Sequence, residues 1–259
     1  MNLNCELNEA EIARVAEAVS AARRVVFFTG AGISAESGLP TYRGIGGLYN
    51  NITVDEGLPI ETVLSGTMFR QSPEITWKYV AEIERACRGA GANAAHRAIA
   101  AVEAAVDVCI ITQNVDGFHT AAGSSNVIEL HGNLGKLACT KCGDEVRVEN
   151  YSGLSIPPRC GSCNGILRPM VVLFGEMLPD AAIHQYDDEL ARGFDVFFSV
   201  GTTAGFAYIF EPIAEASRRG MTTIEINPDL TPLSDIVSHR FDAGARVTLE
   251  AIAERVHNG

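Results

Sequence analysis

Residues 25–43 constrain the fold of this chain more than any other segment. They begin with an apolar run, residues 25–28, that is long enough for a buried parallel strand. The strand leads directly into Gly30-Ala31-Gly32, where glycine permits a positive φ and has no Cβ to hold a ligand away. We expect a helix to open at Ser34, with its first amides and its dipole attracting an anion. Together these features predict a cradle for a pyrophosphate group.

A Gly-x-Gly turn alone also fits an ordinary connection between a strand and a helix, so both interpretations stay open at this point. Ala35 stands where the dinucleotide fingerprint has its third glycine, a replacement that the fingerprint tolerates. The next residues, Pro40-Thr41-Tyr42-Arg43, favour a cofactor site. A rigid proline there presents a hydroxyl, an aromatic ring and a cation just past the turn, and packing alone does not require that set.

Further apolar runs resemble the first one, and they lie at residues 106–112, 127–130, 194–200 and 222–226. Each run is followed by small or polar residues. Segments with apolar residues at helical spacing separate most of the runs, and they lie at residues 9–22, 59–88, 94–105, 181–192, 211–219 and 247–256. This alternation predicts an α/β fold with a doubly wound, parallel, Rossmann-like sheet whose ligand site follows the carboxyl ends of the strands.

Polar side chains follow several of these predicted strands. Gln113, Asn114 and Asp116 follow the second strand, and the position favours a binding site over the alternative of a simple turn. His131 follows the third strand and precedes a glycine, which suits a general base with a pKa near neutrality, although most histidines are structural. His96 fits better as a capping or core histidine. Residues 201–205 form a second small, hydroxyl-rich turn that suits a phosphate or a ribose.

Two Cys-x-x-Cys pairs carry the chemical signal that can be read most directly. Cys139 and Cys142 form the first pair, and Cys160 and Cys163 form the second. Each pair lets two thiolates face one ion, and two pairs complete a tetrahedral zinc shell. Because four thiolates leave no open position, we expect a structural zinc. A redox pair is the alternative, and the duplication at zinc-ribbon spacing disfavours it.

The zinc module and one other segment interrupt the alternating pattern. Residues 44–57 are rich in glycine and asparagine, which favours a loop that covers a cofactor over a plain connection. We therefore predict a Rossmann-like domain made of residues 1–43, 93–134 and 168–259, a cofactor loop with a helical module at residues 44–92, and a zinc-binding module at residues 135–167. The zinc module is too small to bury a core of its own, so metal binding should supply its folding free energy.

Composition narrows the class of protein and of ligand. With 259 residues, 47% apolar residues and 20% charged residues, the chain is typical of a soluble globular protein. Its net charge of −12 argues against nucleic acid as a partner and is compatible with a lysine-rich protein segment. The polar start lacks the pattern of a secretion signal, and no apolar run approaches the ~20 residues that span a bilayer. We expect a cytoplasmic protein without a membrane partner, in which seven cysteines serve metal binding or catalysis before disulfides.

These motifs together resemble the sirtuins, the NAD-dependent protein deacylases, and in particular their short bacterial and archaeal members. The resemblance is carried, in family order, by Gly30-Ala31-Gly32-Ile33-Ser34, Ser37-Gly38-Leu39-Pro40-Thr41-Tyr42-Arg43, Thr112-Gln113-Asn114-Val115-Asp116, Leu130-His131-Gly132, the four cysteines, Val171-Val172-Leu173-Phe174-Gly175-Glu176, Gly201-Thr202-Thr203 and Ile226-Asn227-Pro228.

The resemblance implies roles for these residues. The NAD cradle would be formed by Gly30, Ala31, Gly32, Thr41, Arg43, Gly201, Thr202 and Asn227. Ile33, Asn114 and Asp116 look like the nicotinamide pocket, Gln113 like a ribose contact, and His131 like the base, so that His131, Asn114 and Asp116 would carry catalysis. Glu36, Tyr42, Thr203 and Pro228 lie in the same motifs and complete the expected cofactor contacts. Val172, Phe174, Gly175 and Glu176 look like the groove in which an acyl-lysine peptide lies as an added strand.

The family chemistry consumes NAD as a co-substrate. The acyl oxygen of the modified lysine attacks the ribose as nicotinamide leaves, His131 then deprotonates a ribose hydroxyl, and the acyl group passes to ADP-ribose. Protein ADP-ribosylation at the same site and a non-catalytic NAD sensor are the alternatives, and the presence of His131 disfavours the sensor.

Two features of the sequence depart from the family pattern. Residues 204–208 do not match the usual run after the second small turn. Members that remove acidic acyl groups carry a Tyr-x-x-Arg pair, whereas the nearest candidate here, Tyr79 to Glu82, ends in a carboxylate that should repel a succinyl group. We therefore expect a neutral acyl chain, with acetyl as the first choice.

Overall fold

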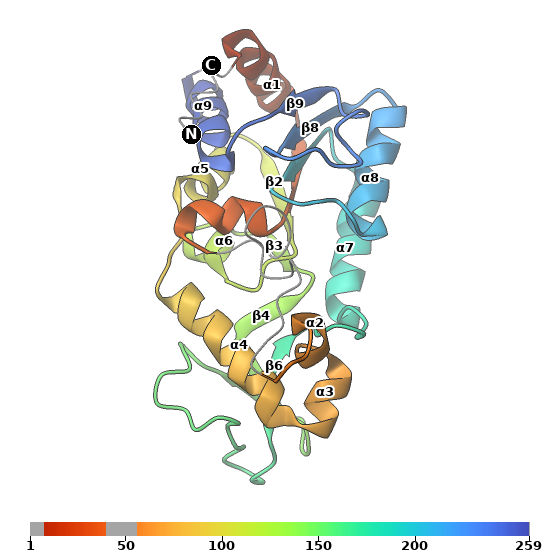
Figure 1. The fold of residues 1–259 in the computed structure, drawn as a ribbon. Coiled ribbons are helices and arrows are strands. Elements are labelled where there is room, and N and C mark those ends of the chain that lie inside the picture. Colours follow the sequence, from red (N-terminus) through yellow and green to blue (C-terminus); the bar gives the residue numbers. More distant parts are fainter. Residues whose placement is uncertain (1–7, 40–55, 259) are drawn as a thin grey trace.

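The computed structural model describes residues 8–39 and 56–258. Its larger sheet is parallel and has the strand order β3-β2-β1-β7-β8-β9 (Figure 1). These strands span Val127–Glu129 (β3), Asp107–Thr112 (β2), Arg24–Thr29 (β1), Val196–Val200 (β7), Thr222–Ile226 (β8) and His239–Phe241 (β9). Renumbered within this sheet alone, the order is that of the Rossmann fold, and the chain changes direction across the sheet between β1 and β7. The predicted fold class is therefore confirmed.

Helices cover both faces of this sheet. One layer contains α1 (Glu9–Ala21), α5 (Ala94–Val102) and α9 (Ala245–Asn258), and the other contains α7 (Asp180–Arg192) and α8 (Ala207–Arg218), as Figure 1 shows. Alternate residues of β1 point into the two cores: Val25 and Phe27 face the first layer, and Val26 and Phe28 face the second. This two-sided burial explains why the strands read as continuous apolar runs.

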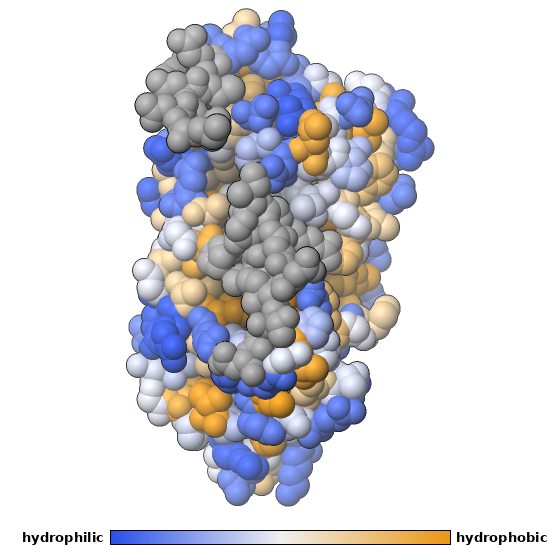
Figure 2. All heavy atoms as spheres, in the orientation of Figure 1, coloured by the Kyte–Doolittle hydropathy of each residue, from blue (hydrophilic) through white to orange (hydrophobic). Residues whose placement is uncertain are grey.

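A smaller domain lies beside the carboxyl ends of the large sheet (Figure 1). It contains the antiparallel sheet β5-β4-β6, with strands Glu145–Arg147 (β5), Gly132–Cys139 (β4) and Leu167–Val171 (β6). The helices α2 (Ile60–Val63), α3 (Gly66–Gln71) and α4 (Pro73–Arg88) pack against it. Figure 2 shows hydrophilic residues at both ends of the molecule, with hydrophobic residues gathered nearer the middle.

The helical segment and the zinc module share one hydrophobic core. Trp77 of α4 is fully buried, lies edge-on to Tyr151 with ring centroids 5.3 Å apart, and donates from its indole nitrogen to the carbonyl of Leu167 over 2.9 Å. From the sequence we predicted residues 44–92 and 135–167 to be separate modules. The shared core instead joins the described part of the first segment to the second, and the small sheet extends beyond residues 135–167 on both sides.

Several predicted elements differ from the observed ones. Residues 31–37 form a 3₁₀ helix (Ala31–Ser37, η1) where a helix of the α type was expected from Ser34. Residues 59–88 are helical as predicted and form three helices. Helix α8 begins at Ala207, four residues before the predicted start, and continues through Pro212. The short strand β9 was not predicted, because its sequence His-Arg-Phe has no apolar run and only its pairing with β8 makes it a strand.

Local capping signals were easier to interpret. Asn8 caps α1 by accepting a hydrogen bond from the amide of Glu11 over 3.2 Å. His96 is fully buried and forms a reciprocal capping box with Asn93 at the start of α5, which confirms its structural role. Among the described helices, none combines the length and the apolar character needed to cross a membrane.

Candidate active site and metal centre

Aligned strand ends bring the predicted site residues to one edge of the large sheet. Thr29, the last residue of β1, lies opposite Thr112 in β2 and opposite Val200 in β7. The turns that follow these strands are therefore neighbours in space, although they are far apart in sequence. The amide of Gln113 donates to the Thr29 carbonyl over 3.0 Å, and the amide of Gly30 donates to the Val200 carbonyl over 3.1 Å.

Glycines in the first and second small turns allow these turns to touch. A Cβ on Gly32 would lie 2.6 Å from Cα of Gly201, and a Cβ on Gly201 would lie 2.4 Å from the Ile33 nitrogen. Gly201 has φ +59°, whereas Gly30 is extended with φ −130°. Gly30 therefore does not use the positive φ that glycine permits. Close approach of the two backbones is what requires glycine here.

The first turn uses several of its amides within the protein. Gly32 donates to the carbonyl of Gly201 over 2.8 Å, and Ile33 donates to the carbonyl of Gly30 over 3.2 Å. The expected anion site at the amides of an α-helix N-terminus is therefore not formed as predicted. These hydrogen bonds instead hold the two turns together around the switch point, and a bulkier residue would fill the space between them.

Asn114 and Asp116 converge on the hydroxyl of Ser34. The Ser34 hydroxyl donates to a carboxylate oxygen of Asp116 over 2.8 Å, and the Asn114 side-chain amide reaches the Ser34 hydroxyl at 3.2 Å and the carbonyl of Gly30 at 3.1 Å. Burial raises the pKa of Asp116, against the opposing effect of hydrogen bonds from the Phe118 amide and from Ser34. The result is a buried set of amide, carboxylate and hydroxyl groups. Ser34 was present in a recognised motif, but sequence reasoning did not select it as a site residue.

Two neutral histidines underlie this polar cluster. The rings of His96 and His119 are 4.9 Å apart, and Nε2 of His119 lies 2.9 Å from the hydroxyl of Thr29. Burial lowers the pKa of His96 to about 4 and that of His119 to about 3. Nδ1 of His119 is buried without a hydrogen-bond partner. Both rings are therefore uncharged at neutral pH and support the floor of the site.

His131 lies between the two domains, directly before β4. Burial lowers its pKa, and a hydrogen bond to the Gln113 carbonyl opposes that shift. Because a carbonyl oxygen only accepts, the ring nitrogen that faces it carries the proton. The other nitrogen, Nε2, lies 2.8 Å from the hydroxyl of Tyr208. His131 is thus neutral at pH 7 with an accepting nitrogen, the state that a general base needs. Tyr208 lies in the divergent segment 204–208 and was not predicted as a site residue.

The second small turn is tied to its neighbours on either side. The Thr202 hydroxyl donates to the Gln113 side-chain oxygen over 2.8 Å, and the Asn227 side-chain amide donates to the Thr202 carbonyl over 2.9 Å. Thr203 and Pro228 are exposed along the same edge. These contacts gather the predicted residues from the ends of β2, β7 and β8.

Some predicted cofactor residues lie elsewhere. The carboxylate of Glu36 pairs with Arg246 of α9 over 2.8 Å, and a Cβ on Gly244 would lie 2.5 Å from it, so this side chain packs against the α9 end of the domain. Ala31, Gly32 and Ile33 remain at the switch point. Thr41, Tyr42 and Arg43 lie outside the described residues, as does most of the predicted cofactor loop.

The predicted substrate segment, residues 172–176, borders His131 and the helical part of the small domain. The Val172 amide donates to the His131 carbonyl over 2.9 Å, and the Phe174 amide donates to the Leu64 carbonyl over 2.9 Å. Gly175 is exposed and has φ +79°. The carboxylate of Glu176 accepts two hydrogen bonds from Arg168, at 2.9 and 3.0 Å, and therefore fastens this segment to β6.

The pair considered for acyl selectivity does not form a charged pocket. Glu82 is exposed on α4, whereas Tyr79 is buried and its hydroxyl bonds the carboxylate of Glu56. The structure therefore gives no reason to expect that Glu82 repels an acidic acyl group. Position 82 still lacks the cation that members removing acidic acyl groups carry.

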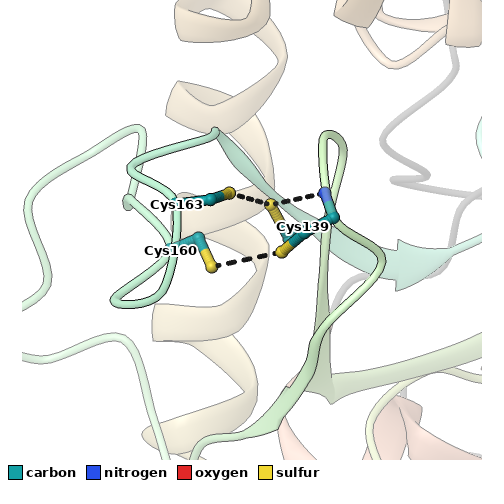
Figure 3. Close-up of side chains that lie close together, drawn as sticks. Cys139, Cys160 and Cys163 are labelled. Atoms are coloured by element: carbon teal, nitrogen blue, oxygen red, sulfur yellow. Dashed lines mark hydrogen bonds between the residues drawn. The ribbon is translucent and has the colours of Figure 1, made fainter.

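The four cysteines form the predicted metal centre. All four Sγ atoms lie within 4.8 Å of one another, with Cys139 and Cys163 3.4 Å apart and Cys142 and Cys160 3.7 Å apart. Figure 3 shows the side chains from the two knuckles pointing toward one another. Tetrahedral zinc with Zn–S bonds of about 2.3 Å requires sulfurs about 3.8 Å apart, and a disulfide requires about 2 Å. The spacing therefore fits zinc.

The protein environment favours a thiolate at Cys139. The amides of Cys142 and Lys141 donate to Sγ of Cys139 and lower its pKa to about 6. A Cβ on Gly165 would lie 2.8 Å from that same sulfur, so the second knuckle needs glycine at this position. Four cysteine sulfurs complete the coordination shell, which makes the site structural.

Comparisons with known proteins agree with this geometry. The Sir2 family model matches residues 30–207. The chain is 47% identical to NAD-dependent protein deacylase 2 of Pseudomonas aeruginosa over 95% of this chain and 97% of that protein. It is 37% identical to NAD-dependent protein deacylase 1 of Archaeoglobus fulgidus over 94% and 97% of the two chains.

Solved structures give the same result. A Sir2 homologue in complex with NAD matches with a TM-score of 0.83 and 36% identity, over 95% of this chain and 93% of that chain. A Sir2 complex with a p53 peptide and NAD matches with a TM-score of 0.79 and 28% identity, over 95% and 98%. Because the family model matches more than half of the chain, including His131 and all four cysteines, this chain belongs to the Sir2 family.

Proposed function

We propose that this chain is an NAD-dependent protein lysine deacylase that releases nicotinamide and passes the acyl group to ADP-ribose. The observation that carries the proposal is the placement of a neutral, accepting His131 at the same sheet edge as the Asn114–Asp116–Ser34 cluster. Relatives at 47% and 50% identity carry the name NAD-dependent protein deacylase and support this function. Acetyl is the first acyl group to test.

The close-packed glycine turns and the polar groups around them fit NAD. We infer that the cofactor lies along the carboxyl ends of β1, β2, β7 and β8, against Gly30, Ala31, Gly32, Ile33, Gln113, Asn114, Asp116, Gly201, Thr202, Thr203, Asn227 and Pro228. Thr41, Tyr42 and Arg43 remain proposed contacts from the segment outside the described residues. Glu36 is the weakest of the proposed contacts, because its carboxylate already pairs with Arg246.

The chemistry that NAD supplies is a glycosidic bond to a good leaving group, nicotinamide. The residues of this chain would orient the NAD and remove a proton from one of its ribose hydroxyls. The side chains of Asn114 and Asp116 offer a donor and an acceptor to a carboxamide, and their burial strengthens these hydrogen bonds. His131 would hold the proton of a ribose hydroxyl at Nε2, the nitrogen that is unprotonated in this structure.

The peptide would add as a strand beside residues 172–176, which follow β6 and contact both His131 and the helices of the small domain. Val172, Phe174 and Gly175 are the proposed contacts, and Glu176 would act by holding the segment through Arg168. The net charge of −12 supports a lysine-rich protein segment over nucleic acid as the partner. We infer a neutral acyl chain because position 82 carries glutamate where the Tyr-x-x-Arg pair has its cation.

We also infer a cytoplasmic location. The support is the chemistry of the cysteines: the six described ones are free, and four of them form a thiolate centre. Reduced cysteines of this kind are typical of the cytosol.

The test uses purified, zinc-loaded protein, labelled NAD and an acetyl-lysine peptide. The parent should release nicotinamide and form O-acetyl-ADP-ribose. His131→Ala should lose at least about 100-fold in turnover, the usual contribution of a general base, and keep its NAD affinity. His184→Asn, which changes an exposed histidine on α7, is the matched control and should behave as the parent.

Three results would contradict the proposal or part of it. Absence of nicotinamide release with any of a panel of acylated peptides would refute deacylation. Transfer of the label to protein, without O-acyl-ADP-ribose, would assign ADP-ribosylation to this site instead. Normal turnover by His131→Ala would refute the assignment of the base.

A further inference from the structure

Tyr208 is held against His131 by contacts on both its backbone and its side chain. The Tyr186 hydroxyl of α7 donates to the Tyr208 backbone carbonyl over 2.7 Å. That carbonyl is available because residue 212, four positions further along α8, is Pro212 and has no amide hydrogen to donate back to it. The phenol ring stacks on Phe206, with centroids 5.2 Å apart and planes 10° apart. The ring is therefore fixed in position before any ligand binds.

The hydrogen bonds around the Tyr208 hydroxyl have one consistent direction. The Thr202 hydroxyl donates to the side-chain oxygen of Gln113, which leaves the Gln113 amide group as a donor. A hydrogen bond from the Gln113 side chain lowers the pKa of Tyr208 against the larger, opposing effect of burial, as expected for a donor to the phenol oxygen. The phenol hydrogen is then free to point to Nε2 of His131, 2.8 Å away.

The other ring nitrogen of His131 completes the pattern. A hydrogen bond with the Gln113 backbone carbonyl raises the pKa of the His131 ring against the larger effect of burial, and because Nε2 faces Tyr208 we assign this contact to Nδ1 as the donor. Gln113 thus contacts both sides of the pair, by its carbonyl to the histidine and by its side chain to the tyrosine. In this arrangement Nε2 can only accept, so the imidazole is held in one tautomer. Isolated imidazole rings with no such partners exchange between the two.

We propose that Tyr208 is a positioning residue that fixes His131 in the tautomer with Nδ1 protonated and Nε2 ready to accept a proton. The inference rests on the proposed deacylase function for its kinetic consequence, but the tautomer itself is a property of the ligand-free protein. Tyr208 lies in segment 204–208, where the sequence departs from the usual family pattern.

The first test is spectroscopic and needs no substrate. Long-range ¹⁵N–¹H correlation spectra of the ¹⁵N-histidine-labelled holoprotein should show His131 with a protonated Nδ1 and an unprotonated Nε2. Tyr208→Phe keeps the ring and removes the hydroxyl, and it should shift His131 to a mixture of tautomers. Tyr151→Phe removes a buried hydroxyl from the small domain and should leave the His131 signals unchanged. A single Nδ1–H tautomer in Tyr208→Phe would overturn the proposal.

The second test separates the two halves of the reaction. Exchange of labelled nicotinamide into NAD, in the presence of acyl-peptide, reports on bond cleavage before the base acts, whereas O-acyl-ADP-ribose reports on the step that follows. Tyr208→Phe should lower kcat for O-acyl-ADP-ribose about tenfold, the equivalent of one hydrogen bond of about 1.4 kcal/mol. Exchange and the KM for NAD should stay near the parent values.

The possible outcomes distinguish a positioning role from a structural one. A general packing defect would lower exchange and product formation together and would lower Tm, and that result would overturn the proposal. Equal or faster product formation by Tyr208→Phe would overturn it as well. If the parent itself released no nicotinamide, the proposed function would fail, and the spectroscopic test of Tyr208 would still stand.

Discussion

The buried pair His96 and His119 makes the stability of this protein depend on pH. Both side chains are almost fully buried, with exposed fractions of 0% and 2%. Burial is the first cause of their lowered pKa values, about 4 for His96 and about 3 for His119. An unfolded chain exposes both rings, and their pKa values return to about 6.5. The prediction concerns how the free energy of unfolding changes when the pH is lowered from 8 to 6.

The sign follows from the number of protons bound in each state. Between pH 8 and pH 6 the unfolded chain takes up protons at both histidines and the folded protein does not, so the free energy of unfolding falls as the pH falls. With pKa values of about 6.5 unfolded and about 3 to 4 folded, each histidine removes about 0.8 kcal/mol at pH 6, and the pair removes about 1.6 kcal/mol. The lowered pKa of His131 adds in the same direction.

The assay is urea unfolding of the zinc-loaded protein at pH 8 and pH 6. Far-UV circular dichroism follows the helices of both domains, and fluorescence of the single tryptophan, Trp77, follows the small domain. His119→Gln should remove about half of the pH dependence, whereas the control His184→Gln should keep all of it. Equal unfolding free energies at the two pH values, or an unchanged pH dependence in His119→Gln, would refute the reasoning.

Two further predictions concern the contact between the small turns and the metal centre. Gly201→Ala should destabilise the protein by at least ~2 kcal/mol and weaken NAD binding at least tenfold in calorimetry, because the new Cβ would lie 2.4 Å from the Ile33 nitrogen at φ +59°. Gly193→Ala, at φ +78° and ψ 159° with nothing within 4 Å, should cost about 1–3 kcal/mol through backbone strain alone and keep NAD affinity, and an equal loss of NAD affinity in the two variants would contradict the close-contact argument. Removal of zinc by a chelator, or Cys142→Ser, should forfeit much of a binding free energy of ~10 kcal/mol and unfold the small domain, seen as a red shift of Trp77 fluorescence. An unshifted spectrum in protein shown to be free of zinc would argue against a structural ion.

The features that the sequence predicted well are those encoded by neighbouring residues. Strands of the large sheet are buried on both faces, so each is a continuous apolar run that ends where the side chains become small or polar. The metal centre was equally easy to predict from the sequence, because each pair of ligands lies within four consecutive residues and needs only one turn of chain. His131 and the turn at Gly201 were found by their position after such strands.

The features that the sequence missed depend on partners far along the chain. Ser34 is an ordinary small residue until Asn114 and Asp116 are folded against it. Tyr208 lay in a segment without a recognisable motif, and its role follows from the 2.8 Å contact with His131. For Glu36 the sequence indicates a cofactor contact, whereas the structure shows its carboxylate paired with Arg246, a partner 210 residues away that no local signal reveals.

The metal centre and the base are mechanically connected, although zinc has no open coordination position. His131 directly precedes β4, and the same strand ends at the ligand Cys139. β4 pairs with β6, and the chain after β6 returns to His131 through the hydrogen bond from the Val172 amide to its carbonyl. A Cβ on Gly132 would lie 1.9 Å from the Met170 carbonyl oxygen, so the two strands are in tight contact beside the base. An ion that fixes one end of this antiparallel pair therefore also restricts the position of the histidine at the other end.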